Sequence, residues 1–290
     1  MNISCIVTHP GGAHKDDLLA CSLMIAKHGV TVFRREPTPE DLADPRVCVI
    51  DVGGEHAPER MNFDHHQFPA DHPPTCALSL VLQHLNLYED ARAFCDWLEP
   101  AEWFDTRGPN VTAKWLGVSR DVLMKLNSPI DVTLLRRFAA TNKLEPGDPI
   151  WQMMCFVGED LVYYLRNLRE RLNYLKEHAE FLQVEDMEVV FLPRNEEMPS
   201  EAAQGMGRFI AEAGKEEAVG AMIYPDRRGK GYAISRYNDD PRLDFSGLAD
   251  GYEDVHFAHA RGFVAKTSAT ELDRLKELLL ASYTPLSSDS

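Results

Sequence analysis

The sequence predicts an α/β protein of 290 residues with two domains. Short, continuous apolar runs rich in β-branched residues alternate with helical patterns over the first half, as is typical of a buried parallel sheet. The segment Pro146-Gly147-Asp148-Pro149 then interrupts the chain, and a long helical pattern with many charges follows it. A second, shorter series of apolar runs and helical patterns comes after this helix, so we expect a smaller mixed α/β domain there.

The first domain begins with a strand, a helix and two more strands. Residues 3–8 (ISCIVT) form an apolar run that ends at a glycine-rich loop. The helix that follows is apolar nearly all round before Gly29 ends it, which suits packing between a sheet and other elements. Residues 30–33 and 47–54 complete the series, and the order strand, helix, strand, strand favours a mainly parallel sheet flanked by helices.

Two polar residues lie where strands of this sheet are expected to end. His9 follows the first strand, and Asp51 lies near the end of the third. Ligands of such sheets gather beyond the carboxyl ends of the strands. We therefore expect both side chains to face one crevice.

The remaining segments set the predicted domain boundaries. Helical patterns cover residues 75–86, 89–104 and much of 119–140, and after the linker helix strands are expected at 187–193, 218–225 and 231–237 and helices near 201–213 and at 269–282. The predicted division is a catalytic domain at 1–149, a linker helix at 150–182 and a C-terminal domain at 183–290.

Composition limits the classes of function. The formal net charge of −16 disfavours a protein that holds long duplex DNA by neutralising phosphates. It leaves room for a small or single-stranded phosphate substrate, because bound divalent cations reverse the local charge. No apolar run reaches the roughly 20 residues of a membrane span, so we expect a cytoplasmic protein without a membrane partner. The six cysteines form no CxxC pair, and we expect free, buried thiols.

Histidine and aspartate cluster in two short segments of the first domain. The first is His9-Pro-Gly-Gly-Ala-His14-Lys-Asp16-Asp17, and the second is Asp64-His65-His66. The glycine pair lets the backbone turn sharply, so that the first segment can converge on one small volume. With Asp51 in a strand-end DVGG and Asp105 in a turn-like FDTRG, the set supplies enough ligands for two metal ions with a shared carboxylate. Mixed imidazole and carboxylate ligands suit Mn²⁺, Fe²⁺, Zn²⁺ or Co²⁺ better than Ca²⁺, with Mg²⁺ less favoured.

The motifs THPGGAHKDD, DVGG, DHHQ and FDTRG, in this order, resemble those of the DHH phosphoesterase superfamily. The spacing of His9, His14 and Asp16 is similar to that of the melanocyte-proliferating-gene (Myg1-like) family of metal-dependent exonucleases. HFAHARGFVAK at 256–266 also resembles that family's C-terminal signature, although a residue smaller than Arg261 is typical there. The resemblance implies a DHH-type N-terminal domain and a C-terminal DHH-associated-like domain.

The resemblance also implies roles for these residues. His9 and His14 would bind one ion, Asp16, His65 and Asp105 the other, and Asp51 would bridge the two ions. His66 would face the substrate phosphate or leaving oxygen, and Asp64 and Asp17 would orient imidazoles. Two divalent ions, Mn²⁺ before Mg²⁺, Co²⁺, Fe²⁺ or Zn²⁺, would activate a water molecule for attack on a phosphoryl group.

The C-terminal domain would hold the substrate. Its candidate phosphate-binding residues are Arg236, Arg242, His259, Arg261 and Lys266, and the alternative for each is an ordinary solvated surface.

The function predicted from these observations is that of a dinuclear-metal phosphodiesterase or exonuclease. It would hydrolyse single-stranded RNA or short oligonucleotides to nucleoside monophosphates. One alternative is a small-molecule phosphohydrolase acting on pyrophosphate, polyphosphate or dinucleotides, which the net charge of −16 suits at least as well. Another is a metal-binding regulatory protein without turnover. A homodimer is left open.

Overall fold

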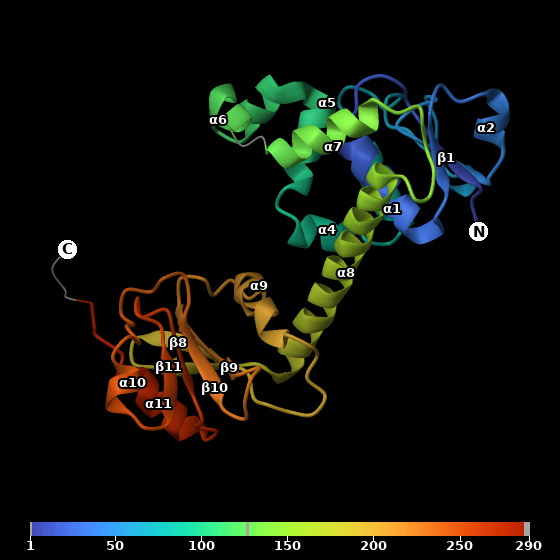
Figure 1. The fold of residues 1–290 in the computed structure, drawn as a ribbon. Coiled ribbons are helices and arrows are strands. Elements are labelled where there is room, and N and C mark those ends of the chain that lie inside the picture. Colours follow the sequence, from blue (N-terminus) through green and yellow to red (C-terminus); the bar gives the residue numbers. More distant parts are fainter. Residues whose placement is uncertain (1, 126–127, 287–290) are drawn as a thin grey trace. The chain divides into compact units, whose positions relative to one another are not determined.

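The computed structural model describes residues 2–125 and 128–286. The chain divides into two compact units, Met1–Arg166 and Asn167–Ser290, and each contains its own six-stranded sheet with helices packed beside it (Figure 1). The predicted α/β class, with a mainly parallel first sheet and a smaller mixed α/β region, is confirmed. The boundary between the units falls inside helix α8 (Pro149–His178), and the three-part division at residues 149 and 182 stays a prediction.

The sheet of the first unit has the strand order β4-β5-β3-β1-β2-β6. Its strands are β1 (Cys5–Thr8), β2 (Thr31–Arg34), β3 (Val47–Ile50), β4 (His56–Ala57), β5 (Asn62–Phe63) and β6 (Lys143–Leu144). The four inner strands β5, β3, β1 and β2 pair in parallel, and the short β4 and β6 run antiparallel at the two edges. Parallel strands end at the same edge of a sheet, so the loops after β1, β3 and β5 lie together.

Helix α1 (Lys15–His28) carries the second half of the first histidine motif. The backbone N–H of His14 donates to the carboxylate of Asp17 (2.8 Å), which fixes the helix start. Gly29 ends the helix in the left-handed region, at φ 65°. Nine of its residues are buried, including Asp16 and Asp17, as predicted for a helix that is covered on most sides.

The other helices of this unit follow the predicted segments in part. They are α2 (Pro39–Ala43), α3 (Ala77–His84), α4 (Tyr88–Phe94), α5 (Leu98–Trp115), α6 (Arg120–Lys125) and α7 (Pro129–Ala139), with a 3-10 turn η1 (Pro58–Arg60). Helix α2 was not predicted, and the helical pattern at 89–104 belongs to α4 and the first part of α5. The helical pattern at 119–140 also belongs to two helices, because Pro129 starts a new one at its N-terminus. The prediction of a turn at Asp105 is wrong: Asp105 is helical, and the backbone breaks three residues later at Gly108 (φ 74°, ψ 169°), before Pro109.

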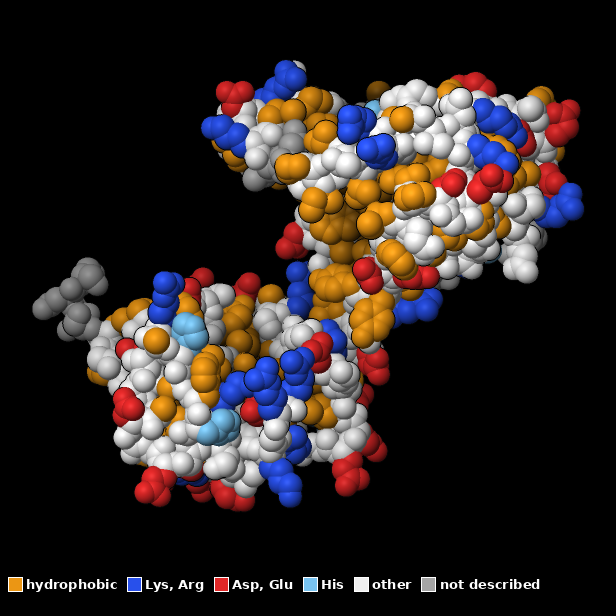
Figure 2. All heavy atoms as spheres, in the orientation of Figure 1, with side chains coloured by type: hydrophobic (Ala, Val, Ile, Leu, Met, Phe, Trp, Pro, Cys, Tyr) orange, Lys and Arg blue, Asp and Glu red, His pale blue; other side chains and the backbone are white. Residues whose placement is uncertain are grey.

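Helix α8 is 30 residues long and starts against the first sheet, where the Trp151 indole donates to the Val30 carbonyl (2.9 Å). Apolar side chains gather along it in the space-filling view (Figure 2), and Met153 and Phe156 are each close to half exposed. Among the described residues, no helix combines the length and the apolar character that a membrane crossing requires.

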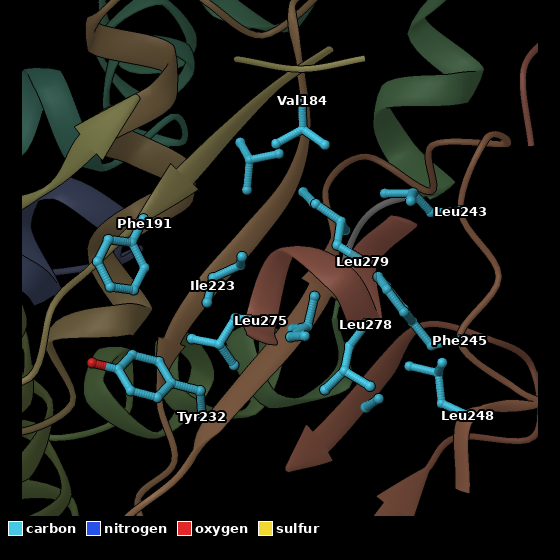
Figure 3. Packing of buried hydrophobic residues seen from close by; sticks show 14 of the residues in the cluster. Val184, Phe191, Ile223, Tyr232, Leu243, Phe245, Leu248, Leu275, Leu278 and Leu279 are labelled. Atoms are coloured by element: carbon cyan, nitrogen blue, oxygen red, sulfur yellow. The ribbon is translucent and has the colours of Figure 1, made fainter. Parts of the chain in front are cut away.

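The second unit is a mixed sheet with helices on it. Its strands are β7 (Glu180–Val184), β8 (Met187–Phe191), β9 (Val219–Pro225), β10 (Tyr232–Arg236), β11 (Val255–Ala258) and β12 (Val264–Thr267), and its helices are α9 (Met206–Glu212), α10 (Leu248–Gly251) and α11 (Leu272–Leu280), with a 3-10 turn η2 (Ala202–Gly205). Only β8 and β9 pair in parallel among its described strands. Leu275 and Leu278 of α11 pack against Ile223 and Phe245 in its core (Figure 3).

Candidate metal centre

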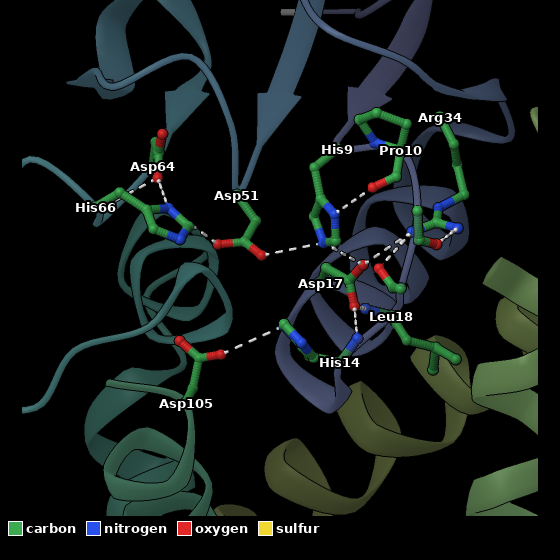
Figure 4. A network of polar contacts seen from close by, with 12 residues as sticks. His9, Pro10, His14, Asp17, Leu18, Arg34, Asp51, Asp64, His66 and Asp105 are labelled. Atoms are coloured by element: carbon green, nitrogen blue, oxygen red, sulfur yellow. Dashed lines mark hydrogen bonds and ion pairs between the residues drawn. The ribbon is translucent and has the colours of Figure 1, made fainter. Parts of the chain in front are cut away.

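Three loops meet at the carboxyl edge of the first sheet. His9 follows β1, Asp51 follows β3, and Asp64 and His65 follow β5. The sequence predicted the convergence of His9 and Asp51 from strand order alone, and the close-up shows them facing each other (Figure 4). The sequence did not predict strand β5, because that strand has only two residues.

A carboxylate at the centre of the cluster lies between two imidazoles. Asp51 Oδ2 is 3.5 Å from His9 Nε2, and Asp51 Oδ1 is 3.1 Å from His65 Nε2. Asp51 is almost fully buried, and its backbone adopts a left-handed φ of 58°. Its N–H donates to the Phe63 carbonyl (3.0 Å), which holds this turn against β5. Each carboxylate oxygen of Asp51 therefore faces a different part of the cluster.

Helix α5 contributes the next carboxylate. Asp105 Oδ2 lies 3.1 Å from His65 Nε2, and Asp105 Oδ1 lies 3.8 Å from His14 Nδ1. His14 belongs to the start of α1, so a residue far along the chain joins the two histidine motifs. The helical conformation of Asp105 serves this placement, because α5 points it into the cluster.

The buried ligand atoms of the cluster make no hydrogen bonds. They are His9 Nε2, both carboxylate oxygens of Asp16, Asp51 Oδ1, His65 Nε2 and Asp105 Oδ2. Buried polar atoms in proteins nearly always have a partner, and an unpaired carboxylate is especially costly. Asp16 is only 2% exposed. Such a set fits divalent cations, which would take the place of the absent donors.

The side-chain atoms also fall into groups of the size that a metal ion requires. Potential ligand atoms lie within 4.8 Å of one another in three groups: Asp51 with Asp64, His65 and His66; His9 with His14 and Asp51; and His14 with Asp16 and Asp105. Asp51 and His14 each belong to two groups. Shared ligands of this kind suit neighbouring ions.

The charges of the cluster shift the pKa values of its members. Burial raises the pKa of Asp16 well above its usual range, and the nearby carboxylates of Asp51 and Asp105 raise it further. Burial also opposes the charged form of His65, but the carboxylates of Asp105 and Asp51 outweigh this effect and raise the pKa of His65 to about 10. Burial and the neighbouring carboxylates thus disfavour the charged form of Asp16.

The carboxylate of Asp64 contacts both the backbone and the ring of His66. Asp64 Oδ1 accepts the backbone N–H of His66 (3.1 Å) and lies 2.6 Å from His66 Nδ1, and Oδ2 accepts the N–H of Gly54 (2.6 Å). Burial opposes ionisation of Asp64, but these hydrogen bonds keep its pKa below the usual range. The His66 side chain is 63% exposed. Asp64 therefore orients His66, whose ring reaches the solvent side of the cluster.

The carboxylate of Asp17 contacts the ring of His9 and the backbone of His14. Asp17 Oδ2 lies 3.0 Å from His9 Nε2, while Oδ1 accepts the N–H groups of His14 (2.8 Å) and Leu18 (2.7 Å). One carboxylate thereby touches both histidines of the first motif. His9 Nε2 also faces Asp51, and His9 Nδ1 lies 3.0 Å from the Pro10 carbonyl, so the role of Asp17 as acceptor of a free imidazole N–H stays a prediction.

Sequence analysis missed Arg34, which supports this loop from the end of β2. Its side chain is 1% exposed, and it donates to the carbonyls of Gly11 (3.1 Å) and Gly12 (3.0 Å) (Figure 4). It also donates to the carbonyl of Phe138 (3.2 Å) and lies over that ring. The available signal was a basic pair at the end of a strand expected beside the first one.

The cluster lies at the floor of a cavity of about 800 Å³. His66, Phe68 and His72 line it together with all the predicted ligands except Asp16. Arg107 is the only arginine or lysine among the described residues that line it, and sequence analysis missed it too. Its guanidinium donates to the His72 carbonyl, which ties the loop after the second motif to α5.

The predicted substrate-binding residues of the second unit differ in their surroundings. Arg242 pairs with Asp240 (2.6 Å) and Asp186 (3.0 Å), and its side chain is 12% exposed. The Asp240 carboxylate raises the pKa of Arg242, and Asp186 adds to this effect, although burial opposes it. Arg236 lies 3.3 Å from Asp239 and over the Phe263 ring. Both arginines therefore already have partners within this unit.

The other three candidates lie on or beside the β11–β12 hairpin. Lys266 Nζ pairs with Asp226 (2.8 Å). His259 stacks on Phe263 with the ring centroids 5.0 Å apart, and its Nδ1 accepts the backbone N–H of Arg261 (3.1 Å). The Arg261 side chain is exposed at the tip. Of the five, Arg261 is the best placed to meet a ligand.

Residues 5–74 match the family model MYG1_exonuc, described as "Uncharacterised protein family (UPF0160)". Over 64 residues the chain is 42% identical to the MYG1 exonucleases of Homo sapiens and Bos taurus, which is 21% of this chain and 17% and 16% of those proteins. The matched part of the chain therefore spans about a sixth of the length of these curated relatives. The resemblance to the Myg1-like family is confirmed over this segment, which contains five of the six predicted metal ligands.

Two solved structures align with most of the chain at low similarity. The pGpG-specific phosphodiesterase PggH from Vibrio cholerae has a TM-score of 0.34 and 14% identity, over 97% of this chain and 98% of that one. RecJ in complex with Mn²⁺ from Thermus thermophilus has a TM-score of 0.28 and 14% identity, over 96% of this chain and 51% of that one.

Proposed function

We propose that this chain is a metal-dependent phosphodiesterase that hydrolyses single-stranded RNA or short oligonucleotides to nucleoside monophosphates. One observation carries the proposal: buried carboxylate and imidazole atoms without hydrogen bonds converge at the floor of an open cavity. The names of the relatives of residues 5–74 describe exonucleases, which supports the choice of substrate.

His9, His14 and Asp51 would hold one divalent ion, and Asp16, His65 and Asp105 would hold a second together with Asp51. The division of Asp51's two oxygens between His9 and His65 supports this bridging role. Mn²⁺ suits the mixed imidazole and carboxylate set, with Mg²⁺, Co²⁺, Fe²⁺ and Zn²⁺ as alternatives. Bound ions would supply a water nucleophile near neutral pH and neutralise charge on the phosphoryl group.

Side chains around the ions would contact the substrate and position the catalytic groups. The exposed ring of His66 would contact a phosphate oxygen or the leaving oxygen, and Asp64 would hold it in one orientation through Nδ1. Asp17 would fix the first motif through the backbone N–H groups of His14 and Leu18, which it accepts. In the second unit, His259 and Arg261 on the β11–β12 hairpin would contact substrate phosphates.

A small-molecule phosphohydrolase is the second candidate. The cavity has a single arginine among its described lining residues, and the net charge is −16. Long polyanions generally require several phosphate contacts, so these two facts favour a short substrate. Pyrophosphate, polyphosphate and dinucleotides all meet this condition.

The test is a substrate panel with two proteins, the Mn²⁺-loaded wild type and the variant Asp51→Asn. Asn tolerates the left-handed backbone of this position, so the variant should fold while losing the bridging charge. We expect stepwise shortening of RNA oligonucleotides by the wild type and only background with the variant. Release of phosphate from pyrophosphate, with RNA left intact, would instead establish the second candidate.

A further inference from the structure

Aromatic rings line the cavity beside the candidate metal centre. Phe68 and His72 stack with ring centroids 4.4 Å apart and an angle of 26° between the rings. His56 meets Phe68 edge-on, at 6.0 Å and 83°. Both stacked residues are only partly buried. They belong to the loop that directly follows the Asp64-His65-His66 motif, so the stack begins within three residues of a predicted ligand.

The backbone holds this loop in a fixed shape. Phe68 N–H donates to the His65 carbonyl (3.0 Å), and His72 N–H donates to the Pro69 carbonyl (2.9 Å). His72 Nδ1 donates to the Pro73 carbonyl (2.8 Å), which sets the ring's tautomer and orientation. Arg107 of α5 donates to the His72 carbonyl. The ring positions are thus formed before any ligand binds.

The proposed hydrolysis at the metal centre assigns no role to the rings of Phe68 and His72. Neither Phe68 nor His72 belongs to the groups of potential ligand atoms. A flat aromatic face beside a site for phosphate suits a substrate that carries a planar ring close to its phosphate. Stacking of a nucleobase on such a face changes affinity by roughly 5- to 150-fold. Inorganic pyrophosphate and polyphosphate have no group that could use it.

We propose that Phe68 and His72 form a subsite for one nucleobase, with the adjacent phosphodiester over the metal centre and the free N–H groups of Arg107 beside its phosphate. This inference rests on the proposed function and refines it: the substrate is a nucleotide ester, and inorganic phosphoanhydrides are excluded. A cavity of about 800 Å³ lies within the range of small-ligand sites, so the subsite takes a terminal nucleotide or a dinucleotide.

Equilibrium binding tests the subsite without hydrolysis. Two dinucleotide probes carry a non-hydrolysable methylenephosphonate link, each with the fluorescent base 2-aminopurine at one end and an abasic ribose at the other. Stacking quenches 2-aminopurine, so one of the two probes should lose fluorescence on binding the Mn²⁺-loaded protein. We expect His72→Ala and Phe68→Ala to bind that probe about tenfold more weakly, with less quenching.

Two further variants separate stacking from loop structure. His72→Phe removes the Nδ1 hydrogen bond to Pro73 and keeps an aromatic face, so it should retain the quenching that His72→Ala loses. His178→Ala removes a ring that contacts Tyr174 in the second unit, with centroids 4.3 Å apart, and should bind like the wild type. Equal binding by the wild type and both alanine variants would overturn the subsite.

Hydrolysis of a natural dinucleotide and of its fully abasic counterpart distinguishes this inference from the proposed function. Faster cleavage of the base-carrying substrate by the wild type, with the difference reduced in His72→Ala, supports both. Equal cleavage of the two substrates overturns the subsite and leaves the phosphodiesterase intact. Quenching that depends on His72, without cleavage of either substrate, supports the subsite and overturns the proposed function.

Discussion

The guanidinium of Arg34 lies 3.7 Å from the carboxylate of Asp17, and both side chains are fully buried. The pair joins the glycine loop to the start of α1, because Arg34 also donates to Gly11 and Gly12 while Asp17 accepts from His14. The two histidines of the first motif therefore depend on one interior ion pair for their positions.

Arg34→Met should leave Asp17 buried without its cation and three carbonyls without their donor. We expect the free energy of unfolding to fall by about 3 kcal/mol, and the dissociation constant for Mn²⁺ to rise roughly tenfold or more. Urea unfolding and calorimetric titration measure the two effects. Arg46→Met is the control, since Arg46 is 71% exposed and pairs only at the surface. Unchanged metal affinity in Arg34→Met would show that the loop holds its shape alone.

Asp16→Asn should have opposite effects with and without metal. In EDTA the uncharged amide avoids the cost that burial and the carboxylates of Asp51 and Asp105 place on the charged form of Asp16, so the melting temperature should rise above that of the wild type. In excess Mn²⁺ the wild type should gain about 2.7 kcal/mol at a hundred times the dissociation constant, and the variant should gain less. Differential scanning calorimetry in EDTA and in excess Mn²⁺ tests whether the order of the two melting temperatures reverses. Asp121→Asn, at an exposed position of α6, should show neither effect.

Asp64→Asn distinguishes an orienting role from direct metal binding. The amide has the same size as the carboxylate. It no longer presents a charged acceptor to the backbone N–H and the Nδ1 of His66. We expect turnover to fall by roughly tenfold to a hundredfold. Mn²⁺ affinity should change little, which calorimetric titration can establish. A large loss of metal affinity would instead place Asp64 among the ligands.

Glu102 anchors the helix that carries Asp105. It is completely buried and accepts from Ser79 (2.6 Å), Tyr88 (2.9 Å) and Arg92 (3.0 Å). Glu102→Leu removes the acceptor of all three groups, and we expect a loss of about 3 kcal/mol in unfolding free energy.

Glu99 provides the matched control for this prediction. It lies 3.6 Å from the same Arg92, but its side chain is 44% exposed. Glu99→Leu should therefore change the unfolding free energy by less than about 1 kcal/mol. Similar losses in the two variants would contradict the anchoring role of Glu102.

Gly262 should not tolerate alanine. Its φ is +68°, and a Cβ atom there would lie 2.1 Å from Asp244 Oδ1. We expect Gly262→Ala to lower the unfolding free energy by about 2 kcal/mol or more. Gly229→Ala in the same unit should be nearly neutral, because its Cβ would meet open space. Chemical denaturation of both variants decides the point.

The sequence predicted three of the six strands of the first sheet because their signals are local. Apolar runs mark β1 and β3, and the glycine after α1 marks its end. The sequence did not predict β4, β5 and β6, since two-residue strands leave no periodicity to detect. Asp105 was assigned the wrong conformation for a related reason: Gly108 and Pro109 signalled a break whose position was taken three residues too early.

The candidate site was predicted as a set of ligand types, and its supports were not predicted. Arg34, Glu102 and Arg107 act through partners that are distant in the sequence, from 23 to 35 residues away for the contacts with Gly11, Ser79 and His72. Pairings of this kind depend on how the helices pack. Metal ligands, in contrast, can be recognised by residue type and by their place after strands.

The left-handed backbone at Asp51 has a consequence for related genes. Asparagine adopts this conformation as readily as aspartate, so the turn after β3 survives the exchange. The codons of the two amino acids differ in one base. A single transition can therefore remove the central charge while the turn after β3 keeps its backbone conformation. Under the proposed function, asparagine at this position is the expected mark of a gene copy that has kept the fold and lost hydrolysis.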